Sequence, residues 1–238
     1  MHKIAIMQPY FFPYIGYISL IKNTDKFILF DVVQFIRHGW IERNRILKPE
    51  LGWQYIAVPL VKHEQTTLIK DIKINNNEKW KDKIFAQLQH YKKKSPFYKQ
   101  TIEVVTKGLN IETDSIVELN YSTLKAVCEY LEISFDCEIF SNMNLEIESV
   151  NAPDEWALNI TEALGYSEYW NPPGGMEFFD KTKYEKAGIN LKFQQVNIKP
   201  YSQRRGTQNI ETGLSIIDVM MFNSVEKIKE MLDDYELL

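Results

Sequence analysis

Three arginines surround one tryptophan in residues 37–45, and these side chains are the best suited in the chain to bind an anion. They are Arg37, Arg43 and Arg45, set around Trp40. A planar guanidinium binds phosphate or carboxylate through two parallel hydrogen bonds. The whole chain carries a formal charge of -4, so any attraction of an anion has to be local. The segment predicts an anionic ligand, and the competing interpretation is pairing with the chain's own acids.

A loop rich in tyrosine and proline precedes this segment and leads from an apolar run into a helical stretch. Its candidate binding residues are Gln8, Tyr10, Tyr14, Gly16 and Tyr17. Free N–H groups at the start of a helix attract phosphates, and aromatic rings form walls for a sugar or a base. Glycine permits close approach of backbone or ligand. The alternative is a rigid turn that packs aromatic side chains.

Nucleotidyltransferase folds have a His-x-Gly-His signature in the equivalent place. Here the string reads Tyr14-Ile15-Gly16-Tyr17. Tyrosines do not supply the paired imidazoles that stabilise a transferring phosphoryl group. The likeness is therefore architectural, and nucleotidyl transfer stays an alternative function.

A proline-glycine string late in the chain is a second candidate for anion binding. Asn171 opens it, and Gly174 and Gly175 close it. Successive N–H groups in such a bend form a nest around an anion. Glu177 is the nearest carboxylate. The alternative is a plain tight turn.

The last candidate residues lie near the C-terminal helices. Tyr201 and Gln203 precede two arginines, Arg204 and Arg205, in a predicted loop. Ser215 is expected to cap the following helix. Asp218 lies in a largely apolar stretch of that helix, so it is expected to be buried and paired, with one of the arginines as a candidate partner.

Proton transfer has three candidate groups. Asp31 follows a predicted strand, where active-site acids of parallel sheets lie, and Asp218 is the second carboxylate. His38 carries an imidazole, which titrates near neutral pH. The sequence contains neither a Ser-His-Asp order nor His-x-x-x-His nor a Walker-type string, so it predicts no metal site.

The pattern of apolar residues predicts the elements that position these groups. Strands are expected at residues 3–7, 27–31, 52–60, 68–74, 135–140, 169–171 and 190–196, and helices at 14–22, between 77 and 133, and at 154–164, 215–222 and 225–232. The first strand lacks alternation, which is typical of parallel strands buried on both faces. We predict an α/β, Rossmann-like fold with a mostly parallel sheet and a helical insertion. Residues 1–75 form the N-terminal half with the ligand loops, 76–150 the insertion, and 151–238 the second half of the same domain.

Composition limits the class of protein. The 238 residues are 45% hydrophobic, enough for a substantial core. The sequence pI of about 5.7 argues against bulk attraction to nucleic acid or an anionic membrane. Cys128 and Cys137 lack metal-ligand spacing and are expected to be free and buried. We see no signal peptide and no apolar run of about 18 residues, so we expect a cytoplasmic protein without membrane insertion.

Five strings together resemble the WbqC-like family of bacterial O-antigen and surface-polysaccharide clusters. They are residues 6–17, 25–31, 40–46, 169–175 and 214–223. The resemblance adds Asn44 to the candidates above. It implies a glycine or other aminoacyl transferase that acts on an amino sugar. This chain departs from the family's pattern at residues 152–156 and 209–213, and both departures are expected to flank the site.

We therefore expect an enzyme that acylates the amine of a nucleotide-linked amino sugar. Its diphosphate suits the arginines, and its rings suit the tyrosines and Trp40. Asp31 or His38 serves as base, while Gln8, Asn44 or the Gly174-Gly175 amides donate to the oxyanion. The donor stays open among aminoacyl-tRNA, acyl-CoA, an acyl carrier protein and formyl-tetrahydrofolate. A binding protein without catalysis is a further alternative. All of these depend on the early loops and the late diglycine bend meeting in one pocket.

Overall fold

The computed structural model describes residues 2–203 and 210–238. Within them a six-stranded sheet forms the centre, in the order β5-β2-β1-β6-β7-β8. The strands are β1 (Lys3–Met7), β2 (Lys26–Leu29), β5 (Cys137–Ile139), β6 (Glu168–Asn171), β7 (Asn190–Val196) and β8 (Tyr235–Leu237). The neighbouring strands are parallel apart from β7 and β8. The predicted α/β, Rossmann-like architecture with a mostly parallel sheet is confirmed.

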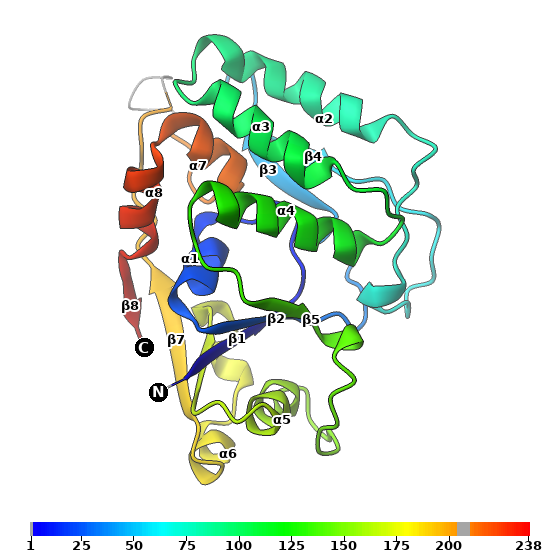
Figure 1. Cartoon of the computed structure of the whole chain (residues 1–238), viewed down its shortest axis with the longest axis vertical. Coiled ribbons are helices and arrows are strands. Elements are labelled where there is room, and N and C mark those ends of the chain that lie inside the picture. The colour runs from blue at the N-terminus through cyan, green and yellow to red at the C-terminus, as the bar shows by residue number, and fades with distance from the viewer. Residues whose placement is uncertain (1, 204–209) are drawn as a thin grey trace.

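Helices cover both faces of this sheet (Figure 1). One face carries α1 (Ile15–Asn23), α7 (Ile216–Phe222) and α8 (Val225–Leu232), and the other carries α5 (Glu155–Ala163) and α6 (Lys181–Lys186). In β1, Ala5 belongs to the larger apolar cluster, whereas Ile4 and Ile6 belong to the cluster on the opposite face. Burial on both faces is the physical reason that this strand lacks alternation.

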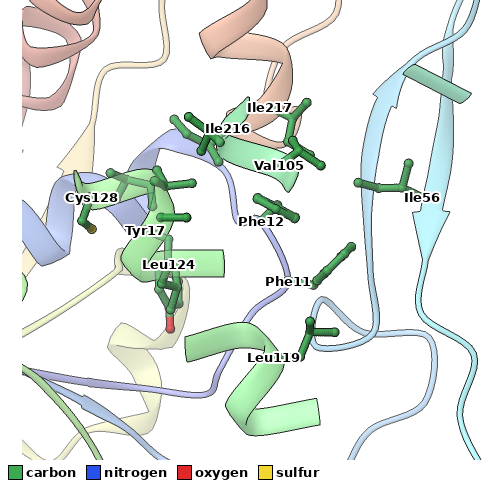
Figure 2. Packing of buried hydrophobic residues seen from close by; sticks show 14 of the residues in the cluster. Phe11, Phe12, Tyr17, Ile56, Val105, Leu119, Leu124, Cys128, Ile216 and Ile217 are labelled. Carbon is green, nitrogen blue, oxygen red and sulfur yellow. The ribbon is translucent and has the colours of Figure 1, made fainter. Parts of the chain in front are cut away.

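A second layer of helices and a two-stranded ribbon extend the larger cluster. The helices are α2 (Trp80–Leu88), α3 (Tyr98–Leu109) and α4 (Ile116–Tyr130), and the ribbon pairs β3 (Arg43–Leu47) with β4 (Trp53–Ala57) in antiparallel register. Figure 2 shows Phe11 and Phe12 pointing into this cluster with residues of α3, α4 and α7. The loop after β1 is therefore anchored by its own aromatic side chains.

The structure corrects two details of the predicted elements. Residues 68–74 form a short 3-10 turn (Ile69–Asp71) with isolated bridges instead of a strand. Their N–H groups are used elsewhere, since Ile69 donates to the Val33 carbonyl and Lys70 to the Asp31 carbonyl. Conversely, the polar residues at 43–45 belong to β3. The sequence did not predict this strand, because a polar residue such as Asn44 is not expected to be buried on a strand.

The described residues 2–203 and 210–238 include no helix with both the length and the apolar character needed to traverse a bilayer.

Candidate functional site

The order in which the chain adds strands to the sheet reverses between β1 and β6. From β1 the connections lead outward to β2 and β5, and from β6 they lead the other way to β7 and β8. Ligands of open parallel sheets bind in the crevice beyond the carboxyl ends of the strands at such a switch point. Here Gln8 follows β1 and Asn171 is the last residue of β6, and the sequence nominates both.

A cavity of about 190 Å³ lies at this point, and we call it the switch-point cavity. It is walled by the strand ends and by aromatic residues: Ile6, Met7, Gln8, Tyr10, Phe30, Pro153, Trp156, Ala157, Tyr169, Asn171, Phe178 and Phe179. Asn171 faces it with an internally bonded amide, because its oxygen accepts from the Tyr169 hydroxyl at 3.1 Å and its nitrogen donates to the Pro172 carbonyl at 3.1 Å.

A larger cavity of about 950 Å³ adjoins it, and we call it the wide cavity. Its walls are Gln8, Phe30, Val33, Gln34, Ile36, Val150, Asn151, Ala152, Pro153, Trp156 and Phe178. Gln8, Phe30, Pro153, Trp156 and Phe178 are shared with the switch-point cavity. The two cavities therefore have a common wall.

A third cavity, of about 280 Å³, lies on the other side of Tyr10, and we call it the arginine cavity. It is lined by Tyr10, Tyr14, Trp40, Asn44, Arg45, Ile198 and Gly213. Tyr10 lines this cavity and the switch-point cavity, and its ring packs on that of Tyr17 with centroids 5.4 Å apart. Partial burial raises the pKa of the Tyr10 phenol, so it stays protonated and neutral at pH 7.

The loop that carries Gln8, Tyr10 and Tyr14 is held through its backbone carbonyls. The Tyr17 hydroxyl donates to the Gln8 carbonyl at 2.8 Å, and Asn120 Nδ2 donates to that of Pro9 at 2.8 Å. Asn44 Nδ2 reaches the carbonyls of Phe11 and Phe12 at 3.1 and 3.0 Å. Ser215 Oγ adds a bond of 2.7 Å to the Phe12 carbonyl. We call these four side chains the loop clamp.

The clamp gives a structural role to three residues that the sequence nominated for binding. Tyr17 and Ser215 are buried and line none of the three cavities. Asn44 lines the arginine cavity, yet its nitrogen holds two loop carbonyls and its oxygen accepts from the Arg45 N–H at 2.8 Å. Their contribution to the site is to fix Tyr10 and Tyr14 in place.

Gly16 is explained by Tyr14. A Cβ atom at Gly16 would lie 2.4 Å from Cε2 of the Tyr14 ring, which is far inside van der Waals contact. The glycine therefore lets the ring fold back over the start of α1, where it lines the arginine cavity.

The structure separates the three arginines. The Arg45 guanidinium lies 5.3 Å from the ring centroid of Trp40 and 5.2 Å from that of Trp53, and its Nη2 donates to the Gly213 carbonyl at 3.0 Å. Arg43 stacks on Tyr55 at 4.0 Å and donates to the His38 carbonyl, while Arg37 donates to the His63 carbonyl at 2.7 Å. Only Arg45 lines any of the three cavities.

Asp31 is buried two residues after the end of β2. Its two carboxylate oxygens accept from the Ser141 N–H at 3.0 Å and the Ser141 hydroxyl at 2.6 Å. Burial raises its pKa, and the bonds from Ser141 oppose that effect. Asp31 thus joins β2 to the turn after β5 (Phe140–Asn142), and it lines none of the three cavities.

His38 is exposed in a left-handed conformation, with φ of 63°, and its N–H donates to Glu42 Oε1 at 2.6 Å. Burial raises the pKa of the Glu42 carboxyl. Neither residue lines one of the three cavities. Of the three predicted catalytic residues, Gln8 alone reaches them.

The diglycine does not form the predicted nest. Gly174 and Gly175 lie in a 3-10 helix (Pro173–Phe178), and neither has the positive φ that an αR–αL nest requires. Neither they nor the exposed Glu177 line the three cavities. The expectation that the early loops and the diglycine bend meet in one pocket is therefore wrong. The late string contributes through Asn171 and Phe178, which line the switch-point cavity, whereas Trp40 lines the arginine cavity and Tyr10 lines both.

Asp218 is fully buried, as predicted, and ties three segments together. It accepts from the hydroxyls of Tyr91 and Tyr201, each at 2.6 Å, and from Gln203 Nε2 at 3.2 Å. Burial and the nearby Asp218 raise the pKa of both tyrosines well above the usual value. The prediction of an arginine partner involves Arg204 and Arg205, which lie outside the described residues.

Sequence reasoning missed several residues that form the walls. Phe30, Trp156 and Phe178 line two cavities each, and Asn120 belongs to the loop clamp. The signal for Trp156 was its position in the departure at 152–156. Ala152 and Pro153 also line the wide cavity, and Gly213 of the second departure lines the arginine cavity. Residues 2–203 and 210–238 contain no group of three or more His, Cys, Asp or Glu side chains arranged to hold a metal ion.

Comparison with known proteins agrees with the resemblance noted from the sequence. A model of the WbqC-like protein family matches residues 8–230. The uncharacterized protein Rv1507c of Mycobacterium tuberculosis (strain ATCC 25618 / H37Rv) is 27% identical over 226 residues, which cover 94% of each chain. No solved structure matches significantly. With a family model that spans nearly its whole length, this chain belongs to the WbqC-like protein family.

Proposed function

We propose that this protein binds a nucleotide-linked amino sugar at the switch point and transfers an acyl group to its amine, as a cytoplasmic step in making an O-antigen or a related surface polysaccharide. The observation that carries the proposal is a row of three adjoining cavities with aromatic walls across the carboxyl ends of β1 and β6. One end of the row presents a guanidinium, and the middle presents amides.

The arginine cavity suits the nucleotide diphosphate. Arg45 is held between two tryptophan rings and by the Gly213 carbonyl, so its planar head is ordered before a ligand arrives. Trp40 is 39% exposed and offers a ring face to a base or a sugar. The sugar then extends past Tyr10 toward Gln8.

Gln8 is the residue best placed to assist amide formation. Its side-chain amide has no hydrogen-bond partner among residues 2–203 and 210–238, and it borders the wide and switch-point cavities. Attack of the amine on an acyl carbonyl creates an oxyanion, and an amide N–H donor stabilises that charge. The described walls contain no Asp, Glu or His. We therefore propose that the amine enters unprotonated and that its proton leaves through solvent.

The proposal is tested by measuring sugar-nucleotide binding in Arg45→Ala and Arg43→Ala. Loss of a charged hydrogen bond removes about 1.5–3 kcal/mol, or roughly 10- to 100-fold in affinity. We expect that loss for Arg45→Ala alone, because Arg43 is directed to the His38 carbonyl. Calorimetry with a panel of uridine, thymidine and guanosine diphosphate sugars measures it. Equal effects of the two variants, or no binding of any sugar nucleotide, would contradict the proposal.

A non-catalytic binding protein is the second candidate, and it is favoured by the absence of Asp, Glu and His from the described walls. The two functions differ in turnover. Mass spectrometry of a bound amino-sugar nucleotide incubated with acyl donors detects the added acyl group, and Gln8→Ala should slow its appearance at least tenfold. Tight binding without any product across all donor classes would favour the binder.

A further inference from the structure

The proposed nucleotide site in the arginine cavity does not use the wide cavity, and the two cavities differ in the chemistry of their walls. None of its described lining residues is charged. Three carry side-chain amides, Gln8, Gln34 and Asn151, and the others are apolar. At about 950 Å³ it is also the largest of the three cavities. A second substrate of its own fits this difference better than an extension of the diphosphate site does.

Two carboxylates beside the wide cavity pair with the same lysine. Asp154 and Glu155 follow the lining residue Pro153, and both pair with Lys183, at 3.1 and 2.8 Å. Glu155 also accepts from the backbone N–H groups of Asn151 and Ala152. An ammonium group against the wall at residues 151–156 would lose water without gaining a free carboxylate, which is unfavourable. The wall thus favours a neutral ligand.

The amides leave acceptors available to such a ligand. Gln34 Nε2 donates to the Gln65 carbonyl at 2.8 Å, and Asn151 Nδ2 donates to the Ser149 carbonyl at 3.3 Å. Their side-chain oxygens accept no hydrogen bond from residues 2–203 and 210–238. Two open acceptors beside apolar walls complement an uncharged ligand that carries amide N–H groups and methyl groups.

We propose that the wide cavity binds the pantetheine arm of an acyl thioester, which makes a thioester the acyl donor; this inference rests on the proposed transferase function. The arm is neutral, contains two amides and a geminal dimethyl group, and ends in sulfur. It enters past the exposed rim residues Ile36 and Phe178 and places the thioester at Gln8, which the wide cavity shares with the switch-point cavity. The amine nitrogen forms a bond to the thioester carbonyl carbon and the C–S bond breaks. The nitrogen then releases a proton to solvent, the thiolate takes a proton from solvent, and an amide and a free thiol result.

The test is to measure the binding of pantetheine itself by saturation-transfer NMR and by quenching of tryptophan fluorescence. We expect transfer to the geminal methyl groups and at least fivefold weaker binding in Trp156→Ala, which removes a wall of the cavity. Leu51→Ser is the matched control, because Leu51 is an exposed apolar residue that lines none of the three cavities. Gln34→Ala and Asn151→Ala together should weaken binding at least threefold without affecting the core.

Further arms identify the source of the arm and separate this inference from the transferase proposal. Coenzyme A that binds tenfold more tightly than pantetheine indicates a coenzyme A thioester, and equal binding of the two indicates a carrier protein; both support the inference. A sugar nucleotide that binds in an Arg45-dependent way while neither pantetheine nor coenzyme A binds would overturn the inference and leave the transferase proposal standing. Pantetheine binding that Trp156→Ala does not change would also overturn it.

Discussion

Ser215 provides the sharpest test of the loop clamp, because a second serine in the same chain has only half of its role. Ser215 Oγ donates to the Phe12 carbonyl at 2.7 Å and accepts from the Ile217 N–H at 3.2 Å as the N-cap of α7. Ser224 caps α8 by accepting from the Lys227 N–H at 3.3 Å, and within residues 2–203 and 210–238 it makes no bond to the loop that carries Phe12. The Ser215→Ala and Ser224→Ala variants therefore differ in one buried hydrogen bond.

The magnitude follows from the two bonds. Loss of an N-cap costs about 1 kcal/mol, and loss of the bond to Phe12 adds about 0.5–1.5 kcal/mol. Asn44 still donates to the same carbonyl, so it is not left unsatisfied. We expect Ser215→Ala to be destabilised by roughly 1.5–2.5 kcal/mol and Ser224→Ala by about 1 kcal/mol. In a chain of this size, the melting temperatures should fall by roughly 3–10 °C and 2–4 °C.

The assay combines thermal unfolding with sugar-nucleotide binding. Phe12 has a φ of 39°, a conformation that a non-glycine residue keeps only when its surroundings fix it. Without the Ser215 bond the loop should relax and move Tyr10 and Tyr14, so affinity should fall at least threefold. Ser224→Ala should bind as tightly as the unaltered chain. Equal stability losses, together with unchanged binding in Ser215→Ala, would refute the idea that this residue acts through the loop.

Three further predictions address the remaining buried groups. Asp31→Asn should fold as well as the unaltered chain at pH 7, because an amide still bonds Ser141. Burial raises the folded-state pKa of Asp31, so the stability contributed by its carboxyl is fully present below the unfolded-state pKa of about 3.9 and is lost as the pH rises through the folded-state pKa. Denaturant titrations across this pH range should show that the free energy of unfolding depends less on pH in the variant than in the unaltered chain. The same variant should keep its acyl transfer, whereas loss of turnover with intact folding would identify Asp31 as the base. Gly16→Ala should weaken sugar-nucleotide binding by displacing the Tyr14 ring, and in a Tyr14→Ala background it should have no additional effect; additive losses in the double-mutant cycle would show that Gly16 acts otherwise. Asn120→Ala removes both donors to the Pro9 and Ile41 carbonyls and should cost about 2–4 kcal/mol in the free energy of unfolding, so a cost below 1 kcal/mol in urea titrations would contradict the clamp.

The sequence predicted the fold well because its signals are local. The apolar run of β1, the helix after it and the β6 and β7 strands follow from residue types and spacing alone. It failed at β3, where Arg43, Asn44 and Arg45 resemble a polar loop. There the side chains find partners far away in sequence, in Phe11, Phe12 and Gly213, and no local pattern reports such partners.

The sequence predicted which segments form the candidate site, but it did not predict the role of each residue in it. The sequence nominated the loop at 8–17, the arginine segment and the string from Asn171 because their residue types suit ligands. Which of them face a cavity depends on contacts across the fold. Arg43 and Arg45 lie two residues apart on one face of β3, yet only Arg45 reaches a cavity, because Trp40 and Trp53 flank it there while Tyr55 and the His38 carbonyl hold Arg43.

Sequence by itself determined the α/β architecture, the family and the segments that gather at the carboxyl ends of the strands, since periodicity and motif strings are properties of the chain. Tertiary structure alone decided that Tyr17, Asn44 and Ser215 hold the loop and that Phe30, Trp156 and Phe178 form the walls. It also decided that Asp31 bonds Ser141 and lines none of the three cavities. The physical reason is that a buried hydrogen bond or an aromatic wall joins residues that can be more than a hundred positions apart, and only packing brings them into contact.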